Sequence, residues 1–300
     1  MLTHLRPFFF ALLALSLSSH AQSWNEVMTR SDKARALMQK LDSSSRVKPV
    51  NYAIFDISFY GVEQVVADAL APDYSIRSHS LYSPHGASVA SIISSPRMGG
   101  TKSGILKVMN TGIYDDDFEY GEAKLRGSHV KLVHASLGLR DSKVAALVQR
   151  MAQEQGMIFV LSAGNSAQRL GRSLKDYYQG LPAIVVSCVD EDGMLADFAQ
   201  LDSSVTVMAP CGMSNIKSLA LDRSTGKVVE YAFGQTSAGA PQVSRAVLDL
   251  LSLYPELTLE EVRTLIQKSA TEFIEFEGEQ YPLLNHENLI RMALSRYGES

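Results

Sequence analysis

His85-Gly86-Ala87-Ser88-Val89 and Gln235-Thr236-Ser237-Ala238-Gly239-Ala240-Pro241 are the stretches that decide the fold of this chain, because each places a reactive side chain directly before an apolar run of helical length. Two further segments, Phe55-Asp56-Ile57 and Ser162-Ala163-Gly164-Asn165, each follow a short apolar run. Together the four supply an acid, a base, an amide donor and a hydroxyl. Acyl transfer needs this set: a nucleophile, a base, a carboxylate that orients the base, and a donor for the oxyanion.

Short apolar runs alternate with helical stretches along the chain. The runs predicted as strands are residues 51–55, 75–81, 105–109, 130–134, 157–161, 183–188 and 205–208. The predicted helices are residues 61–70, 86–93, 141–155, 241–253 and 259–269, the last with a capping box of Thr258 and Glu261. This alternation predicts an α/β fold: a mostly parallel central sheet with helices on both faces.

The polar candidates lie at the ends of these elements. Asp56 ends an apolar strand, and ligands of open α/β sheets bind at the carboxyl ends of strands. Ser237 lies near a helix start, where its backbone N–H is free to donate to an oxyanion. Taken one at a time, Asp56, His85, Asn165 and Ser237 have ordinary structural interpretations as turn, cap or core residues. The hypothesis of a catalytic site therefore rests on the set.

In their order, Asp before His before Ser, these motifs resemble the subtilisin-like serine proteases, the subtilase family. The resemblance extends over residues 49–295 and includes Ser136-Leu137-Gly138 and the segment from Leu181-Pro182-Ala183 to Ala209-Pro210. It implies a subtilisin-like single domain with serine endopeptidase activity. It implies that Ser237 is the nucleophile, His85 the base, Asp56 the group that orients His85, and Asn165 an oxyanion donor.

The resemblance also implies how a substrate would bind. An extended protein or peptide substrate would lie between two segments and pair with their main chains. These substrate-binding residues are Ser136, Leu137, Gly138, Ser162, Ala163 and Gly164. No cofactor is expected to be required and no metal ligands are assigned, although Asp115-Asp116-Asp117 offers carboxylate oxygens that calcium could use. A solvated loop is the competing interpretation of that acidic run.

The chain departs from the family pattern beside three of the four motifs. Ile57-Ser58 stands where a small hydroxyl residue and Gly are usual, Ala87-Ser88 replaces Thr-His, Gln235 replaces Gly, and Ala238-Gly239 replaces Met-Ala. A catalytically impaired, peptide-binding subtilase fold (a pseudoprotease) is therefore the alternative function.

Two further alternatives belong to other classes of protein. An α/β-hydrolase would use a downstream base such as His286, but Gln235 occupies the first glycine position of its G-x-S-x-G elbow. A purely structural module would leave the four-part set unexplained.

The N-terminus predicts export. Arg6, an apolar run and the small residues up to Ala21 read as a signal peptide, residues 1–21, with a tethered anchor as the competing interpretation. Residues 22–48 are expected to form a helical arm packed on a catalytic domain of residues 49–300. The mature protein is expected in the periplasm or outside the cell, without stable membrane insertion. The sequence does not address its oligomeric state.

The composition argues against nucleic acid as a partner and does not decide whether the two cysteines form a disulfide. The formal net charge is -4 and becomes -5 when the signal peptide, with Arg6 its one charged residue, is removed. With no basic tract, the sequence gives no electrostatic footprint for nucleic acid. Hydrophobic residues make up 46%, enough for one large core. Cys188 and Cys211 could form a disulfide in an oxidising compartment or be two buried small residues.

Overall fold

One parallel sheet forms the centre of the molecule, as the apolar runs predict. The computed structural model describes residues 23–79, 82–112, 115–137, 142–166 and 178–298. The sheet has seven strands in the order β2-β3-β1-β4-β5-β6-β7, and all neighbouring pairs are parallel. The strands are β1 Val50–Asp56, β2 Leu70–Arg77, β3 Gly104–Thr111, β4 Val130–Ala135, β5 Ile158–Ser162, β6 Ala183–Val189 and β7 Val207–Pro210.

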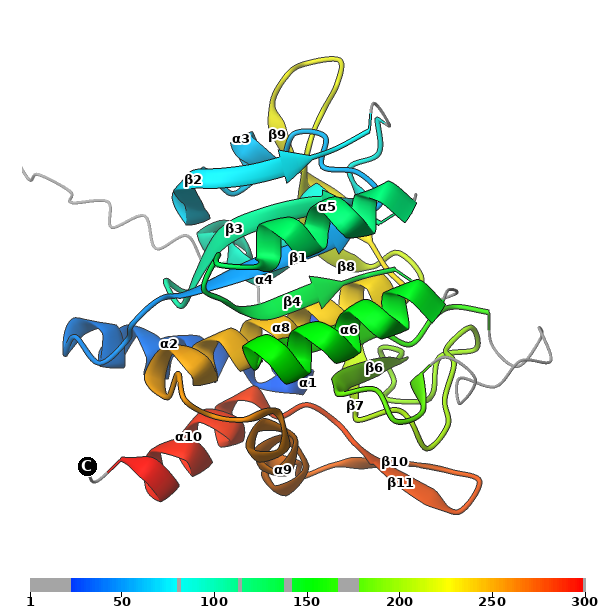
Figure 1. Cartoon of the computed structure of the whole chain (residues 1–300). Helices are drawn as coiled ribbons and strands as arrows, with labels where there is room; N and C mark the ends of the chain where they lie inside the picture. Colours follow the sequence, from blue (N-terminus) through cyan, green and yellow to red (C-terminus); the bar gives the residue numbers. More distant parts are fainter. Residues whose placement is uncertain (1–22, 80–81, 113–114, 138–141, 167–177, 299–300) are drawn as a thin grey trace, which may run out of the picture.

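Helices cover both faces of the sheet. On one face lie α4 (His85–Ser94) and α8 (Thr236–Leu253), and on the other lie α5 (Asp115–Leu125) and α6 (Ser142–Gln155) (Figure 1). Two separate apolar clusters fill the spaces between the sheet and these helix layers. Because the sheet is buried on both sides, its strands read as continuous apolar runs rather than alternating ones. The predicted fold class is confirmed.

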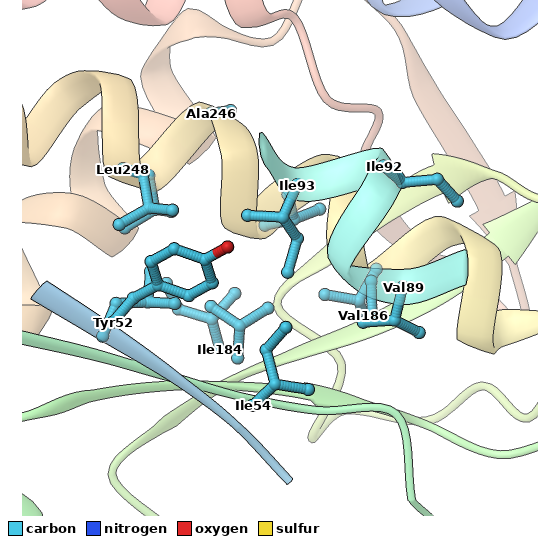
Figure 2. Close-up of a cluster of buried hydrophobic side chains, with 14 of the residues drawn as sticks. Tyr52, Ile54, Val89, Ile92, Ile93, Ile184, Val186, Ala246 and Leu248 are labelled. Atoms are coloured by element: carbon cyan, nitrogen blue, oxygen red, sulfur yellow. The ribbon is translucent and has the colours of Figure 1, made fainter. Parts of the chain in front are cut away.

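The larger apolar cluster holds α4 and α8 against the sheet. Ile54 of β1 and Ile184 of β6 face Val89 and Ile93 of α4 and Leu248 of α8, as Figure 2 shows. All five side chains are buried. Burial of each such side chain stabilises the fold by about 1.5–3 kcal/mol. This packing fixes the starts of α4 and α8 relative to the carboxyl ends of the strands.

The helix predicted over residues 61–70 is wrong in extent. The chain instead forms a short α3 (Val62–Val65), a 3-10 turn η1 (Ala67–Ala69) and then β2, so the strand predicted over residues 75–81 begins earlier. Pro72 accounts for the extended chain at the start of β2, because it disfavours the helical region for the preceding Ala71, whereas α3 already ends at Val65, before that constraint acts. A proline is tolerated there because β2 is an edge strand.

The N-terminal arm packs on the domain as two helices. These are α1 (Trp24–Thr29) and α2 (Ser31–Ser43), separated by Arg30 with φ 54° and ψ 28°. The Asn25 amide donates to the Gln242 side chain of α8 at 3.1 Å, and α2 contacts α10. None of the helices in the described ranges is both long and apolar enough to cross a membrane. The predicted signal peptide lies outside those ranges.

Two antiparallel hairpins and two C-terminal helices complete the fold. The capping box of Thr258 and Glu261 is confirmed at the start of α9. The hairpins, which the sequence patterns did not predict, pair β8 with β9 and β10 with β11. The bounds are β8 Ile216–Leu221, β9 Val228–Phe233, α9 Leu259–Ser269, β10 Phe273–Phe276, β11 Glu279–Pro282 and α10 His286–Tyr297.

Cys188 and Cys211 form a disulfide, which settles the pairing that the sequence left open. The bond joins β6 to the residue that follows β7, with the two Cα atoms 5.6 Å apart. It closes a loop across a sequence separation of 23 residues. The segment between the two cysteines is thus tied at both ends.

Removal of this disulfide is expected to destabilise the protein. Closing a loop of this length stabilises a fold by about 3 kcal/mol in the chain-entropy model. The double variant Cys188→Ala/Cys211→Ala should therefore show a lower free energy of unfolding in urea by about that amount. A reductant should lower the midpoint of the wild type but not of the variant; a wild-type midpoint insensitive to reduction contradicts the bond.

Candidate active site

Asp56 and His85 meet at the carboxyl edge of the sheet. Asp56 ends the central strand β1 with no solvent exposure, and its Oδ1 lies 2.6 Å from Nδ1 of His85, the first residue of α4. The same Oδ1 accepts the Ile57 N–H at 2.6 Å. The turn after the acid therefore forms despite its unusual Ile-Ser sequence.

Gly86 allows this meeting. Its N–H donates to the Ser58 carbonyl at 3.0 Å, which ties the start of α4 to the turn that follows β1. A Cβ at position 86 would lie 2.3 Å from that carbonyl oxygen, closer than any side chain can approach. The glycine of the histidine motif is thus required by the close approach of two backbones.

Two opposed effects set the basicity of His85. Burial disfavours the charged ring and lowers its pKa, while the charge of Asp56 and its hydrogen bond raise it. The Asp56 contributions together win, so the pKa of His85 lies above its ordinary value of 6.5. The edge-to-face ring of Phe233, with centroids 5.0 Å apart, packs against the imidazole. Sequence analysis missed Phe233, which ends β9 in a hairpin that was not predicted.

Ser237 lies at the start of α8 and is 7% exposed. Its hydroxyl donates to the Ser136 carbonyl at 3.4 Å, and within the described ranges it has no hydrogen bond to His85. Hydrogen bonds between a nucleophile and its base are often long or absent without substrate and tighten when substrate binds. The helix begins at Thr236 rather than at residue 241 as predicted, so Pro241 lies inside it.

Asn165 is bound to the same helix start. Its Oδ1 accepts both the N–H of Thr236 at 3.0 Å and the Thr236 hydroxyl at 2.7 Å. With the oxygen engaged, the NH₂ group is the part of the amide left to donate to a ligand. Gly164, with φ 109°, makes the turn that delivers Asn165, and a Cβ there would lie 2.1 Å from Gln200 Oε1. Thr236, which orients the amide, was not singled out from the sequence.

The predicted substrate-binding segments follow two adjacent strands. Ser136 and Leu137 directly follow β4, and Ser162 ends β5, its parallel neighbour. Within the second segment, Ala163 donates to Val186 of β6 at 2.9 Å. The Ser162 carbonyl accepts from Tyr178 and that of Gly164 from Gln200, so part of this backbone is already engaged. Gly138 lies outside the described residues.

A cavity of about 480 Å³ adjoins Asn165. Phe198 and Met213 give it apolar walls, and Asp190 and Asp197 give it carboxylates. The sequence had no means of placing it, because its lining comes from three separate loops.

Two carboxylates of the acidic run at the start of α5, Asp116 and Asp117, bond to basic side chains of the protein itself. Arg77 donates to Asp117 at 2.9 Å and also to Asp116, and His79 Nε2 lies 2.9 Å from Asp117. Across the ranges that the structure describes, no group of three or more His, Cys, Asp or Glu side chains is placed to hold a metal ion. The Asp116 and Asp117 carboxylates thus each accept a hydrogen bond from Arg77.

His286, the base of the α/β-hydrolase alternative, is not at this site. It is 1% exposed at the start of α10, where Nε2 lies 3.0 Å from Oδ2 of Asp249. Asp249 is twelve residues beyond Ser237 on α8, about 18 Å along the helix axis at 1.5 Å per residue. This geometry contradicts that alternative.

Gln235 has a backbone conformation that favours glycine, with φ 62° and ψ -170°. Such strain costs about 1–3 kcal/mol, whereas glycine adds about 0.5–1 kcal/mol of unfolded-state entropy. Gln235→Gly should therefore raise the free energy of unfolding by about 1 kcal/mol. Gln235→Ala keeps a Cβ and should give no such gain; equal stability of the two variants in urea denaturation contradicts the assignment of strain.

Comparison with known families gives one match that spans most of the chain. The family model described as the subtilase family matches residues 63–289. Subtilisin DY of Bacillus licheniformis is 31% identical over 147 residues, which are 47% of this chain and 49% of that protein. The chain thus spans about half the length of the curated relative it matches.

Solved structures share the fold at low identity. A cold adapted subtilisin-like serine proteinase superposes with a TM-score of 0.64 and 19% identity, covering 80% of this chain and 89% of its own. The structure of the subtilase cytotoxin SubAB assembly superposes with a TM-score of 0.65 and 17% identity, and the match covers 92% of this chain and 97% of that one. The family match, the parallel sheet and the motif order agree: this chain belongs to the subtilase family, a family of serine-type endopeptidases.

Proposed function

We propose that this protein is an exported serine endopeptidase that hydrolyses peptide bonds through an acyl-enzyme formed on Ser237. The contact between Asp56 Oδ1 and His85 Nδ1, 2.6 Å at a fully buried carboxylate, is the observation that carries the proposal. It fixes the tautomer of His85, so that Nε2 is the nitrogen left to accept a proton. The side chain of His85 remains 22% exposed, which keeps it within reach of a substrate.

In the first half of the reaction, the Ser237 hydroxyl leaves the Ser136 carbonyl and turns to Nε2 of His85. His85 takes the hydroxyl proton as Oγ attacks the substrate carbonyl carbon, and Asp56 stabilises the imidazolium that forms. The peptide C–N bond then breaks. The leaving amine takes the proton from His85, and the acyl group stays on Oγ as an ester.

In the second half, water replaces the amine. His85 removes a proton from the water molecule, which attacks the ester, and then returns that proton to Ser237 as the product acid leaves. The oxyanion of each tetrahedral intermediate accepts from the Asn165 NH₂ group and from the Ser237 N–H. Thr236 supports this step because it holds the amide oxygen of Asn165 on the opposite side.

The substrate is a protein or peptide in extended form, bound by Ser136, Leu137 and Gly138 on one side and residues 162–164 on the other. One of its side chains enters the cavity beside Asn165. Export is supported by the signal-peptide pattern of residues 1–21 and by the disulfide, which persists in oxidising compartments. We propose no cofactor, and no nucleic acid partner.

A serine-directed fluorophosphonate tests the proposal. The purified protein should be labelled at Ser237, and Ser237→Ala should lose labelling and lower kcat on a peptide substrate about 10⁶-fold. Asn165→Ala should lower kcat about 10²- to 10³-fold, because one oxyanion donor is lost. Ser224→Ala, a serine at the exposed tip between β8 and β9, is the matched control and should behave as wild type.

The outcome separates the two functions considered for this fold. Labelling of wild type and Ser237→Ala to the same extent, with no peptide turnover, would favour a peptide-binding pseudoprotease. If labelling requires Ser237 but no peptide is hydrolysed, Ser237 is a competent nucleophile and the proposed peptide substrate is wrong.

The pH profile tests the pairing of Asp56 with His85. Catalysis needs neutral His85, so kcat/KM should fall as the pH drops through a His85 pKa above 6.5. Asp56→Asn removes the charge that raises the pKa and leaves burial, which lowers it. The acidic limb should then move to lower pH while the plateau rate falls about 10⁴-fold. An acidic limb at the same pH in Asp56→Asn and in the surface control Asp222→Asn contradicts the pairing.

A further inference from the structure

The proline inside α8 leaves the carbonyl of Ser237 without its helical partner. In a regular helix this carbonyl would accept the N–H of the residue four positions later, which is Pro241 and has none. The Ser136 hydroxyl takes that place and donates to the Ser237 carbonyl at 3.2 Å. Ser136 thus contacts Ser237 twice, because its own carbonyl accepts the Ser237 hydroxyl.

The Ser136 hydroxyl is in turn held by His134, a residue that sequence analysis did not single out. His134 has no solvent exposure, and its Nε2 lies 2.8 Å from Ser136 Oγ. Its Nδ1 lies 2.8 Å from the hydroxyl of Ser244, seven residues after Ser237 on α8. The imidazole therefore bridges the strand that ends at the substrate-binding segment and the helix that carries the candidate nucleophile.

The directions of these bonds follow from the donors available. The Ser136 hydroxyl has one hydrogen, and it is donated to the Ser237 carbonyl. The contact with His134 must then be donated by Nε2–H, which leaves Nδ1 as the acceptor of the Ser244 hydroxyl. A neutral ring protonated on Nε2 satisfies all of these bonds, whereas a ring protonated on Nδ1 would need the single Ser136 hydrogen for Nε2 and would leave the Ser237 carbonyl without that donor.

Neutrality of His134 also suits the chemistry of His85. Burial, and then the nearby charge of His85, lower the pKa of His134 to about 3. A charged His134 would oppose the imidazolium that forms on His85 when it takes the proton of Ser237. The site thus contains one imidazole that changes charge and one that keeps its proton in place.

We propose that His134, as the neutral Nε2–H tautomer, is a positioning residue that fixes the orientation of Ser237 through the Ser136 hydroxyl. Without it, the Ser136 hydroxyl is free to turn away, and the Ser237 carbonyl loses the donor that replaces Pro241. The start of α8, which carries Ser237 and the Asn165 partner Thr236, then loses one of its two hydrogen bonds to Ser136 and keeps the 3.4 Å bond from the Ser237 hydroxyl to the Ser136 carbonyl. This inference rests on the proposed function for its catalytic consequence, but the tautomer itself does not.

The tautomer is measured on the wild-type protein by nitrogen-15 NMR of labelled histidine, assigned by loss of the signal in His134→Gln. We expect a protonated Nε2 and an unprotonated Nδ1 at pH 7, unchanged down to pH 5. A ring protonated on Nδ1, or one that is charged in this range, overturns the proposal. This readout needs no activity, so it stands apart from the fluorophosphonate test of the proposed function.

Three substitutions test the effect on catalysis. The Gln side chain can place its amide donor where Nε2 lies, whereas Asn is too short to reach Ser136 and Leu has no donor. His134→Asn and His134→Leu should lower kcat by about 10- to 100-fold with KM little changed, since misplacement of a reacting group is costly. His134→Gln should keep kcat within about fivefold of wild type. Equal kcat values for the Gln and Leu variants, or a wild-type kcat for Leu, contradict the proposal.

A double-mutant cycle separates positioning from a loss of core packing. If His134 acts through the Ser136 hydroxyl, Ser136→Ala combined with His134→Leu should lower kcat no further than the worse single variant. Additive losses would contradict that route. Tyr52 lies on the neighbouring strand β1, and its buried hydroxyl contacts Ser94 of α4; Tyr52→Phe removes that hydroxyl and, as the matched control, should leave kcat unchanged.

Discussion

A buried carboxylate at the end of the central strand is the constraint on which the site depends. Asp56 has no solvent exposure, and an ion in that position is tolerated only when a partner meets it with hydrogen bonds. His85 is that partner, and the close approach of Gly86 to Ser58 brings it there. The parallel sheet places the carboxyl ends of β1, β4 and β5 at one edge, so the acid, Ser136 and Asn165 gather where α4 and α8 begin.

Much of the fold could be predicted from the sequence because its signals are local. Apolar runs without alternation indicate strands covered on both faces, and six of the seven strands of the sheet fall within a few residues of their predicted bounds. The error at residues 61–70 arose from apolar spacing that fits a helix, while Pro72 imposes an extended chain on the residue before it. The β8–β9 hairpin was not predicted, and the burial of β9 does not follow its sequence, because Val228–Phe233 is mostly apolar and yet largely exposed.

At the candidate site, the sequence predicts the residue types but not the contacts that orient them. The residue types at positions 56, 85, 165 and 237 indicate acyl transfer; the structure places Asp56 at the end of a strand, His85 and Ser237 at the starts of helices, and Asn165 in the turn that follows β5. The interactions that orient them are not local: Thr236 holds the Asn165 oxygen, and Phe233 packs on His85. Gln235 replaces a glycine of the family pattern, and the consequence of that replacement is strain in the Gln235 backbone rather than a contact of its side chain.

The central claim is that three groups from distant parts of the chain act on one reacting centre. It is tested most directly by a crystal structure of the protein after reaction with a phosphonate inhibitor. The account predicts a covalent bond from phosphorus to Ser237 Oγ, a phosphoryl oxygen about 3 Å from the Asn165 NH₂ group, and His85 Nε2 beside the adduct. An adduct on another residue, or one on Ser237 whose oxygen faces away from Asn165 and whose Oγ lies out of reach of His85, would contradict it.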